Sequence, residues 1–271
     1  MLSGRVHEVG IISRQGLPGH IAIELFAATH PPYPARMIRF PWMHLAACLA
    51  SATAMASEPA PPDLHERLAA CAACHGDQGQ GMTGNEYYPH LAGKPAGYLL
   101  AQLRAFRDGR RAYSSMKWLM RNMDDAYHAR IAEHYARLPP RSSAIPMPIS
   151  DADATRARRL VENGDPVRGV PACTACHGEN LAGQEPGIPA LIGLPPDYIV
   201  AQLGAWRTGA RHATAPDCMA NVAKALDPRD LRRLGDWLAT RGADHSIAAA
   251  PAGSFDLPIA CGSMPVAGGS R

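Results

Sequence analysis

The sequence has few aromatic and few charged residues, and both shortages limit what the protein can be. Aromatic residues make up 6% of the 271 residues, charged residues make up 19%, and the formal net charge is +3. This mild balance does not suggest nucleic acid as a partner. Hydrophobic residues nevertheless make up 46% of the chain, enough for a sizeable core. We therefore expect a compact protein whose core contains something besides aromatic side chains.

Long apolar runs are also absent, except near the N-terminus. Residues 37–56, MIRFPWMHLAACLASATAMA, combine an early arginine, an apolar run and a small-x-small end. This layout predicts a secretory signal peptide and an exported, periplasmic protein. Translation is then expected to start at Met37, which makes residues 1–36 an over-extended start. The alternative is that they are a genuine N-terminal extension. A lipid anchor through Cys48 is a second alternative, because residues 45–48 resemble a lipobox.

The rest of the chain contains an internal sequence repeat. CAACHG at 71–76 recurs as CTACHG at 173–178. PHL at 89–91, YLLAQL at 98–103 and FRDG at 106–109 recur as PAL, YIVAQL and WRTG, each 100 residues later. Matches at a nearly constant offset indicate a duplicated domain.

Helical periodicity in both copies predicts an all-α fold of two tandem domains, at 62–139 and 152–241. Apolar spacing indicates helices over 124–138 and 227–241, the second with Asp227 as N-cap and Pro228 at its first position. Further helices are expected over 63–70 and 155–164, and after Pro95 and Pro195. Residues 140–151 read as a proline-rich linker and residues 242–271 as a disordered tail.

The repeated C-x-x-C-H motif suits three chemistries. Zinc needs four ligands, and an adjacent Cys and His point apart, while a four-cysteine site would leave both histidines unexplained. A redox pair needs a βαβ context, which is absent from the pattern. Two such motifs in an exported chain therefore predict two covalent c-type haems. The attachment and proximal-ligand residues are Cys71, Cys74 and His75 in the first copy, and Cys173, Cys176 and His177 in the second.

The sixth ligand of each iron is expected to be a methionine. Met219 is the only methionine between the second motif and the tail, and it precedes Leu226 by seven residues. In the first copy Met116 precedes Met123 by the same seven residues, which favours Met116. The alternative is that these methionines only fill the core. Other candidate ligands are Met120, Met123, His128 and His212.

The combined pattern resembles the dihaem cytochrome c4 family of class I c-type cytochromes. It reads CxACHG, P-x-L-x-G, Y-x3-Q-L-x-x-[FW]-R-x-G-x-R and M-x6-[LM], twice, over about residues 62–241. The resemblance implies two periplasmic cytochrome c domains with His/Met-ligated haems near the domain interface. It also implies that the carbonyls of Pro89 and Pro189 accept hydrogen bonds from the proximal histidines. The segment before Met116 is shorter than that before Met219, a departure from the pattern.

Iron with a histidine and a methionine ligand exchanges an electron but has no open coordination site. This favours an electron carrier over an enzyme. The resemblance suggests a quinol-oxidising complex or a dehydrogenase as donor and a terminal oxidase as acceptor, with weak, brief docking. One alternative is a fixed electron-transfer subunit of a dehydrogenase complex, and peripheral membrane association stays open. The other alternative, a dihaem peroxidase, requires that Met116 is not a ligand.

Two further groups of residues have two interpretations each. Cys218 and Cys261 form a disulfide or stay as thiols. Four arginines recur in both copies and either approach haem propionates or are solvated: Arg107, Arg111, Arg207 and Arg211. Tyr98 and Tyr198 are expected in the core.

Overall fold

The computed structural model describes residues 63–82, 85, 87–140, 144–242 and 248–264. The expected signal peptide, the extension before it and the Cys48 anchor lie outside these residues. Within the described residues the regular secondary structure is helical, with isolated β-bridges and no extended strand. The predicted all-α fold class is therefore confirmed. None of the helices in this part of the chain is long and apolar enough to cross a membrane.

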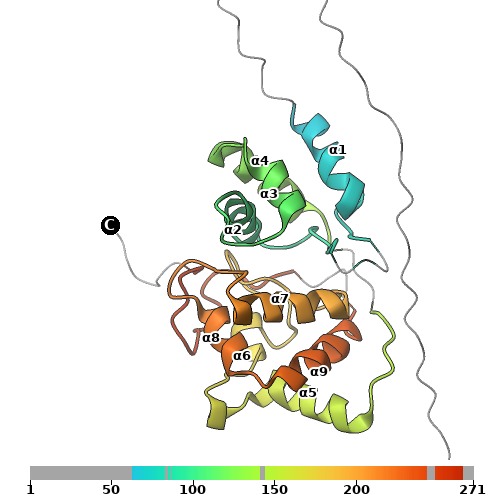
Figure 1. The fold of residues 1–271 in the computed structure, drawn as a ribbon, viewed down its shortest axis with the longest axis vertical. Coiled ribbons are helices and arrows are strands. Elements are labelled where there is room, and N and C mark those ends of the chain that lie inside the picture. Colours follow the sequence, from blue (N-terminus) through green and yellow to red (C-terminus); the bar gives the residue numbers. More distant parts are fainter. Residues whose placement is uncertain (1–62, 83–84, 86, 141–143, 243–247, 265–271) are drawn as a thin grey trace, which may run out of the picture. The chain divides into compact units, whose positions relative to one another are not determined.

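The first domain contains four helices: α1 (Leu64–His75), α2 (Ala96–Arg107), α3 (Ser114–Met120) and α4 (Asp125–Arg137) (Figure 1). Helix α2 packs against both α3 and α4. Its apolar face contributes Leu99 and Phe106 to a core completed by Ile131 and Tyr135 of α4. Helix α4 begins as the sequence predicts, because the Asp124 carboxylate accepts a hydrogen bond from the backbone N–H of Tyr127.

The second domain contains α5 (Asp151–Asn163), the 3-10 helix η1 (Pro166–Arg168), α6 (Thr174–His177), α7 (Pro196–Thr208), α8 (Cys218–Ala225) and α9 (Pro228–Ala239). Helix α9 packs against α5 on one side and α7 on the other (Figure 1). Asp227 is its N-cap and Pro228 its first residue, as predicted. The second core is larger than the first and includes Leu231, Leu234 and Trp237.

Two helix boundaries differ from the sequence-based expectation. Helix α1 was expected to end near residue 70, but it continues through the first C-x-x-C-H motif to His75. Helix α5 begins at Asp151, four residues before the expected start, because Ser150 caps it by accepting from the N–H of Asp153. The motif in the first domain is thus part of a helix whose end places His75.

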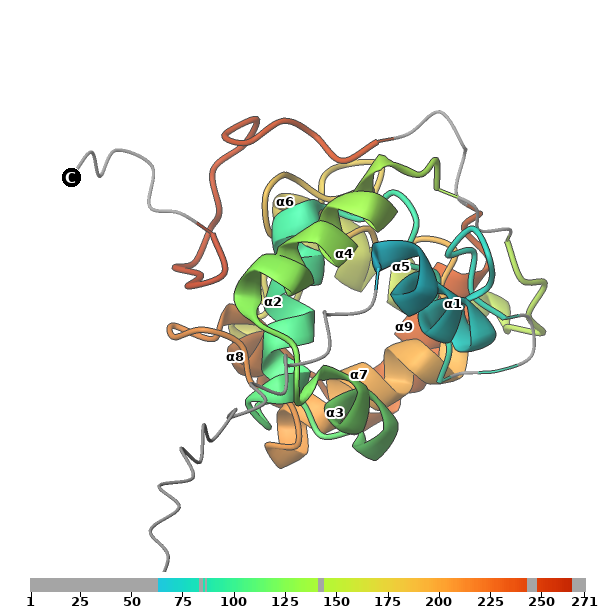
Figure 2. The ribbon, with the colours of Figure 1, turned by 90° about the horizontal axis from the view of Figure 1, so that it is seen from above.

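The two domains meet between α2 and α7 (Figures 1 and 2). Backbone hydrogen bonds join the segments that follow these helices, from the N–H of Ala112 to Ala210 O (2.8 Å) and from the N–H of His212 to Arg110 O (2.7 Å). At the start of α2, a Cβ on Gly97 would lie 2.6 Å from the carbonyl oxygen of Pro186. Only glycine allows this approach of the two backbones.

The prediction of a disordered tail is wrong for residues 248–264. The N–H of Ala250 donates to Gly183 O (2.9 Å), and Ala250 O accepts from the N–H of Glu185 (2.8 Å). Further along, Cys261 forms a disulfide with Cys218 at the start of α8. Composition alone could not reveal this order, because it comes from one covalent bond and from pairing with a distant loop.

Candidate haem sites

The first candidate site is a cavity of about 270 Å³ between α1 and α3. Its lining includes Cys71, Cys74 and His75 from the end of α1 and Met116 from α3. Leu99 and Phe106 of α2 add apolar wall, and most of the lining is apolar. The sequence-predicted residues of the first copy therefore come together around one apolar cavity.

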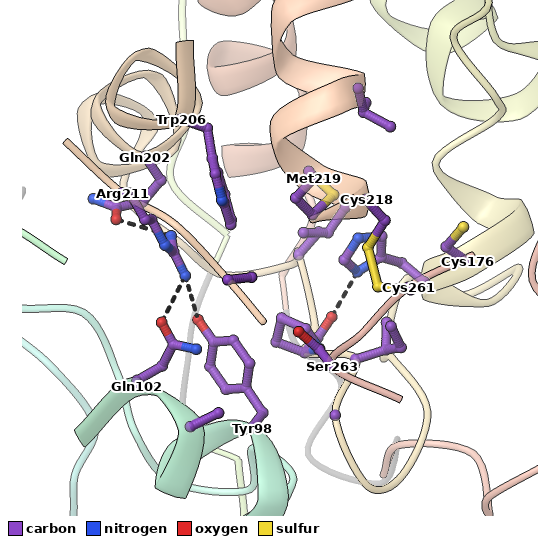
Figure 3. Close-up of a pocket in the computed structure, with 18 of the residues that line it drawn as sticks. Tyr98, Gln102, Cys176, Gln202, Trp206, Arg211, Cys218, Met219, Cys261 and Ser263 are labelled. Carbon is purple, nitrogen blue, oxygen red and sulfur yellow. Dashed lines mark hydrogen bonds between the residues drawn. A yellow bond between two sulfur atoms is a disulfide. The ribbon is translucent and has the colours of Figure 1, made fainter. Parts of the chain in front are cut away.

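The second cavity has a volume of about 140 Å³ and is lined by Cys176, His177 and Met219 (Figure 3). Cys173 packs against the core beside it, at the N-cap of α6. The tail also lines this cavity, through Leu257, Ile259, Cys261 and Ser263. Among the residues that the structure describes, the tail lines only this second cavity.

Both proximal histidines make the contact implied by the resemblance. His75 Nδ1 lies 2.8 Å from Pro89 O, and His177 Nδ1 lies 2.8 Å from Pro189 O. Donation from Nδ1–H leaves the lone pair of Nε2 available for a metal. Burial lowers the pKa of both imidazoles, that of His177 to about 4, so both rings are neutral, as a ligand must be.

The four motif cysteines are unpaired thiols. Burial raises the pKa of Cys71, and it raises the pKa of Cys173 to about 12. No disulfide joins Cys71 to Cys74 or Cys173 to Cys176, so the motif does not form a redox disulfide in this structure.

The structure reduces the candidates for the first distal ligand. Met123 is buried in the first core and does not line the cavity. Met120 lines it but is only 1% exposed and packed within the core. Met116 is partly buried, as Met219 is, and each lies within the first three residues of its helix. Met116 is therefore the counterpart of Met219.

The alternative histidine ligands are less well placed. His128 is fully buried and lines neither cavity. His212 lines the second cavity but is exposed. Met219 lies at the same cavity with its side chain partly buried.

A symmetric polar network lies at the domain interface, between the cavities. Arg111 donates to Gln102 (3.0 Å) and Gln202 (2.7 Å). Arg211 donates to the same two amide oxygens, at 2.8 and 2.9 Å. Each guanidinium also stacks over an aromatic ring near the end of the preceding helix, Arg111 over Phe106 and Arg211 over Trp206. The repeat thus builds one pseudo-symmetric cluster from both copies.

Two tyrosine hydroxyls complete this network. Tyr198 accepts from Arg111 at 2.9 Å, and Tyr98 accepts from Arg211 at 3.4 Å (Figure 3 shows the contacts of Arg211). Each arginine therefore contacts the tyrosine of the other domain. Sequence reasoning missed this role, although the repeated Y-x3-Q spacing was the signal that could have revealed it.

The recurring arginines have two different roles. Arg111 and Arg211 line the cavities, as an interaction with haem propionates requires. Arg107 instead pairs with Asp108 and Asp125 on the surface. Arg207 donates to the carbonyl oxygens of Ala223, Lys224 and Leu226 at the end of α8. An interaction with haem propionates therefore fits Arg111 and Arg211 only.

Breaking the Cys218–Cys261 disulfide should destabilise the protein. The bond closes a loop with a sequence separation of 43 residues, and a crosslink of that length contributes about 4 kcal/mol by the loop-entropy relation. We expect Cys261→Ser to lower the free energy of unfolding by this amount in urea titrations. Cys218→Ser should have the same effect and the double variant no larger one, whereas Ser263→Ala serves as the control. Full stability of both single variants would contradict a structural disulfide.

Comparison with known proteins assigns the family. A family model for cytochrome c matches residues 66–139. The thiosulfate dehydrogenase electron acceptor of Thiomonas intermedia (strain K12) is 37% identical over 182 residues, which is 67% of this chain and 81% of the relative. Cytochrome c4 of Pseudomonas aeruginosa is 30% identical over 175 residues, which is 64% of this chain and 84% of the relative. The chain belongs to the dihaem cytochrome c4 family.

A solved structure is also similar to part of this chain. Thiosulfate dehydrogenase (TsdBA) from Marichromatium purpuratum is 38% identical with a TM-score of 0.57. The match covers 63% of this chain and 36% of that longer chain. This cytochrome therefore corresponds to only about a third of that protein.

This member of the family carries two covalently bound haem c groups, one at each C-x-x-C-H motif. The two apolar cavities suit such a group, since each combines a neutral histidine that has a free Nε2 with a methionine and at least one thiol. When bound, haem iron takes up and releases single electrons. The protein is thus an electron-transfer cytochrome.

Proposed function

We propose that this cytochrome accepts electrons in the periplasm from a dehydrogenase that oxidises thiosulfate and delivers them to a terminal oxidase. Two relatives, 37% and 34% identical, are named electron acceptors of thiosulfate dehydrogenase. Their similarity extends over about four fifths of their own lengths, across both domains. This supports a dehydrogenase rather than a quinol-oxidising complex as the donor.

The observation that carries this function is the shared wall between the two cavities. Six residues line both cavities: Lys94, Tyr98, Gln102, Tyr198, Gln202 and Arg211. Sites that share a wall lie close enough for an electron to pass between them inside the protein. One domain can therefore receive the electron from a donor while the other gives it to an acceptor.

The proposed axial ligands support a carrier rather than an enzyme. His75 with Met116, and His177 with Met219, would occupy both axial positions of each iron. A substrate such as peroxide would then find no open position. The side chains around the iron need only exclude water and keep the ligands in place.

The donor is tested by mixing the oxidised cytochrome with purified thiosulfate dehydrogenase and thiosulfate in a stopped-flow spectrometer. We expect both haems to become reduced, and to stay oxidised when either thiosulfate or the enzyme is omitted. Lack of reduction by the complete mixture, in a protein that dithionite still reduces, would contradict this donor.

A fixed subunit of the dehydrogenase is the second candidate function. It is favoured by the match to part of a longer thiosulfate dehydrogenase chain. Size-exclusion chromatography at native concentrations distinguishes the two, because a subunit elutes with the enzyme and a shuttle elutes alone.

We also propose export with cleavage after Ala56, since residues 37–56 have the layout of a signal peptide. Mass spectrometry of the mature protein should then find Ser57 as the first residue. A lipid-modified Cys48 at the N-terminus would indicate the anchored alternative.

A further inference from the structure

Three cationic side chains are buried where the two cavities adjoin. Lys94 is 5% exposed, Arg111 is 9% exposed and Arg211 is 4% exposed. None of them forms an ion pair with a carboxylate among the described residues. Burying a charge without a counter-charge is unfavourable, so an anion bound at this interface would stabilise it.

Lys94 differs from the two arginines in its contacts. Each guanidinium is satisfied by the Gln and Tyr side chains of the network. The ammonium of Lys94 makes no side-chain hydrogen bond in the described part of the structure, yet Lys94 lines both cavities. An ammonium offers three donors, and a buried one needs acceptors.

Lys94 also breaks the symmetry of the repeat. The tyrosine, glutamine and arginine of the network occur at matching positions in both copies, but the position matching Lys94 holds Leu194. A symmetric interface would have a lysine at this position in both copies or in neither, but this one has a lysine in the first copy only. Its single charge faces both sites at once.

Each cavity also contains one buried nitrogen without a partner. His90 Nδ1 lies at the first cavity, and Trp206 Nε1 lies at the second (Figure 3 labels Trp206). The matching residues are Ala190 and Phe106, so neither group is repeated in the other copy. The polar lining of the two cavities is therefore asymmetric beyond Lys94 itself.

We propose that Lys94 is a shared binding site for propionate carboxylates of both haems and raises the reduction potential of both. Each haem c carries propionates, which supply the anions that the buried cation needs. The ammonium offsets their charge near both irons. Reduction removes one positive charge from each iron, so a neighbouring cation favours the reduced state.

The test is a spectroelectrochemical titration of the dihaem protein and its variants. Lys94→Leu places the residue of the second copy at this position. We expect the equilibrium constant for reduction of each haem to fall roughly tenfold, because a positive charge near the iron is lost. For a one-electron couple this lowers each reduction potential by about 59 mV. Lys94→Arg keeps the charge and should restore both potentials to near the wild-type values.

The chain supplies matched controls. The other two lysines, Lys117 and Lys224, are exposed, one in each domain. Replacing either of them by leucine should leave both potentials unchanged, because water and salt screen an exposed charge. If Lys94→Leu does not fold, Lys94→Met removes the charge and keeps the length of the side chain.

Two outcomes would overturn the proposal. Unchanged potentials in the uncharged variants would show that Lys94 does not act on the haems. A shift confined to one haem would show that the lysine is not shared. Because the titration uses a chemical reductant, it does not depend on whether thiosulfate dehydrogenase is the donor.

Discussion

Replacing Met116 by alanine should remove about half of the far-red charge-transfer band of the oxidised protein, because that band reports iron with a methionine ligand. The first iron would lose its sixth ligand and become high-spin. Electron paramagnetic resonance of the same sample should show the high-spin signal, in an amount equal to one haem per protein. This would also open a coordination position of the kind a peroxidase needs.

Met120 and Met123 provide the controls for this experiment. Both are buried in the first core, and Met120 also lines the cavity. Leucine at either position should cost some stability but leave the far-red band at full intensity. If Met120→Leu removed the band and Met116→Ala kept it, the assignment from the repeat would be wrong.

Replacing Met219 by histidine should lower the reduction potential of the second haem by roughly 0.2 V, a part of the roughly 0.8 V range that axial ligands span. Histidine keeps the iron six-coordinate and low-spin but stabilises the oxidised state relative to methionine. The two reduction steps should separate in a potentiometric titration, with the step of the first haem nearly unchanged. The far-red band should again fall by about half.

Val222, one helical turn after Met219 in α8, provides the control because it also lines the second cavity. Val222→Ala should shift the potential far less. An equal shift in both variants would mean that cavity packing, not ligation, determines the potential of this haem.

The repeat made most of the fold and of the sites predictable. Motifs at an offset of 100 to 103 residues transferred each assignment from one copy to the other and separated Met116 from its neighbours. The predicted cap was equally informative, because Asp227 carries a local signal that does not depend on tertiary contacts. Helix α1 continues past its expected end, through the first motif to His75.

Features that depend on contacts between distant segments were not predictable. The tail is low in periodic apolar residues, yet it closes over the second cavity through the bond of Cys261 to Cys218. Nothing in the sequence marked Lys94, which is buried where the two cavities adjoin. Sequence patterns describe what each copy does alone, whereas these features arise where the copies meet.

The most direct test of the account is the visible spectrum of the purified oxidised protein, combined with its haem-to-protein ratio. We expect two haems per chain and a far-red charge-transfer band with the intensity of two methionine-ligated irons. A band of half that intensity, or a high-spin spectrum, would contradict the conclusion that both sites have His/Met ligation and serve only to carry electrons.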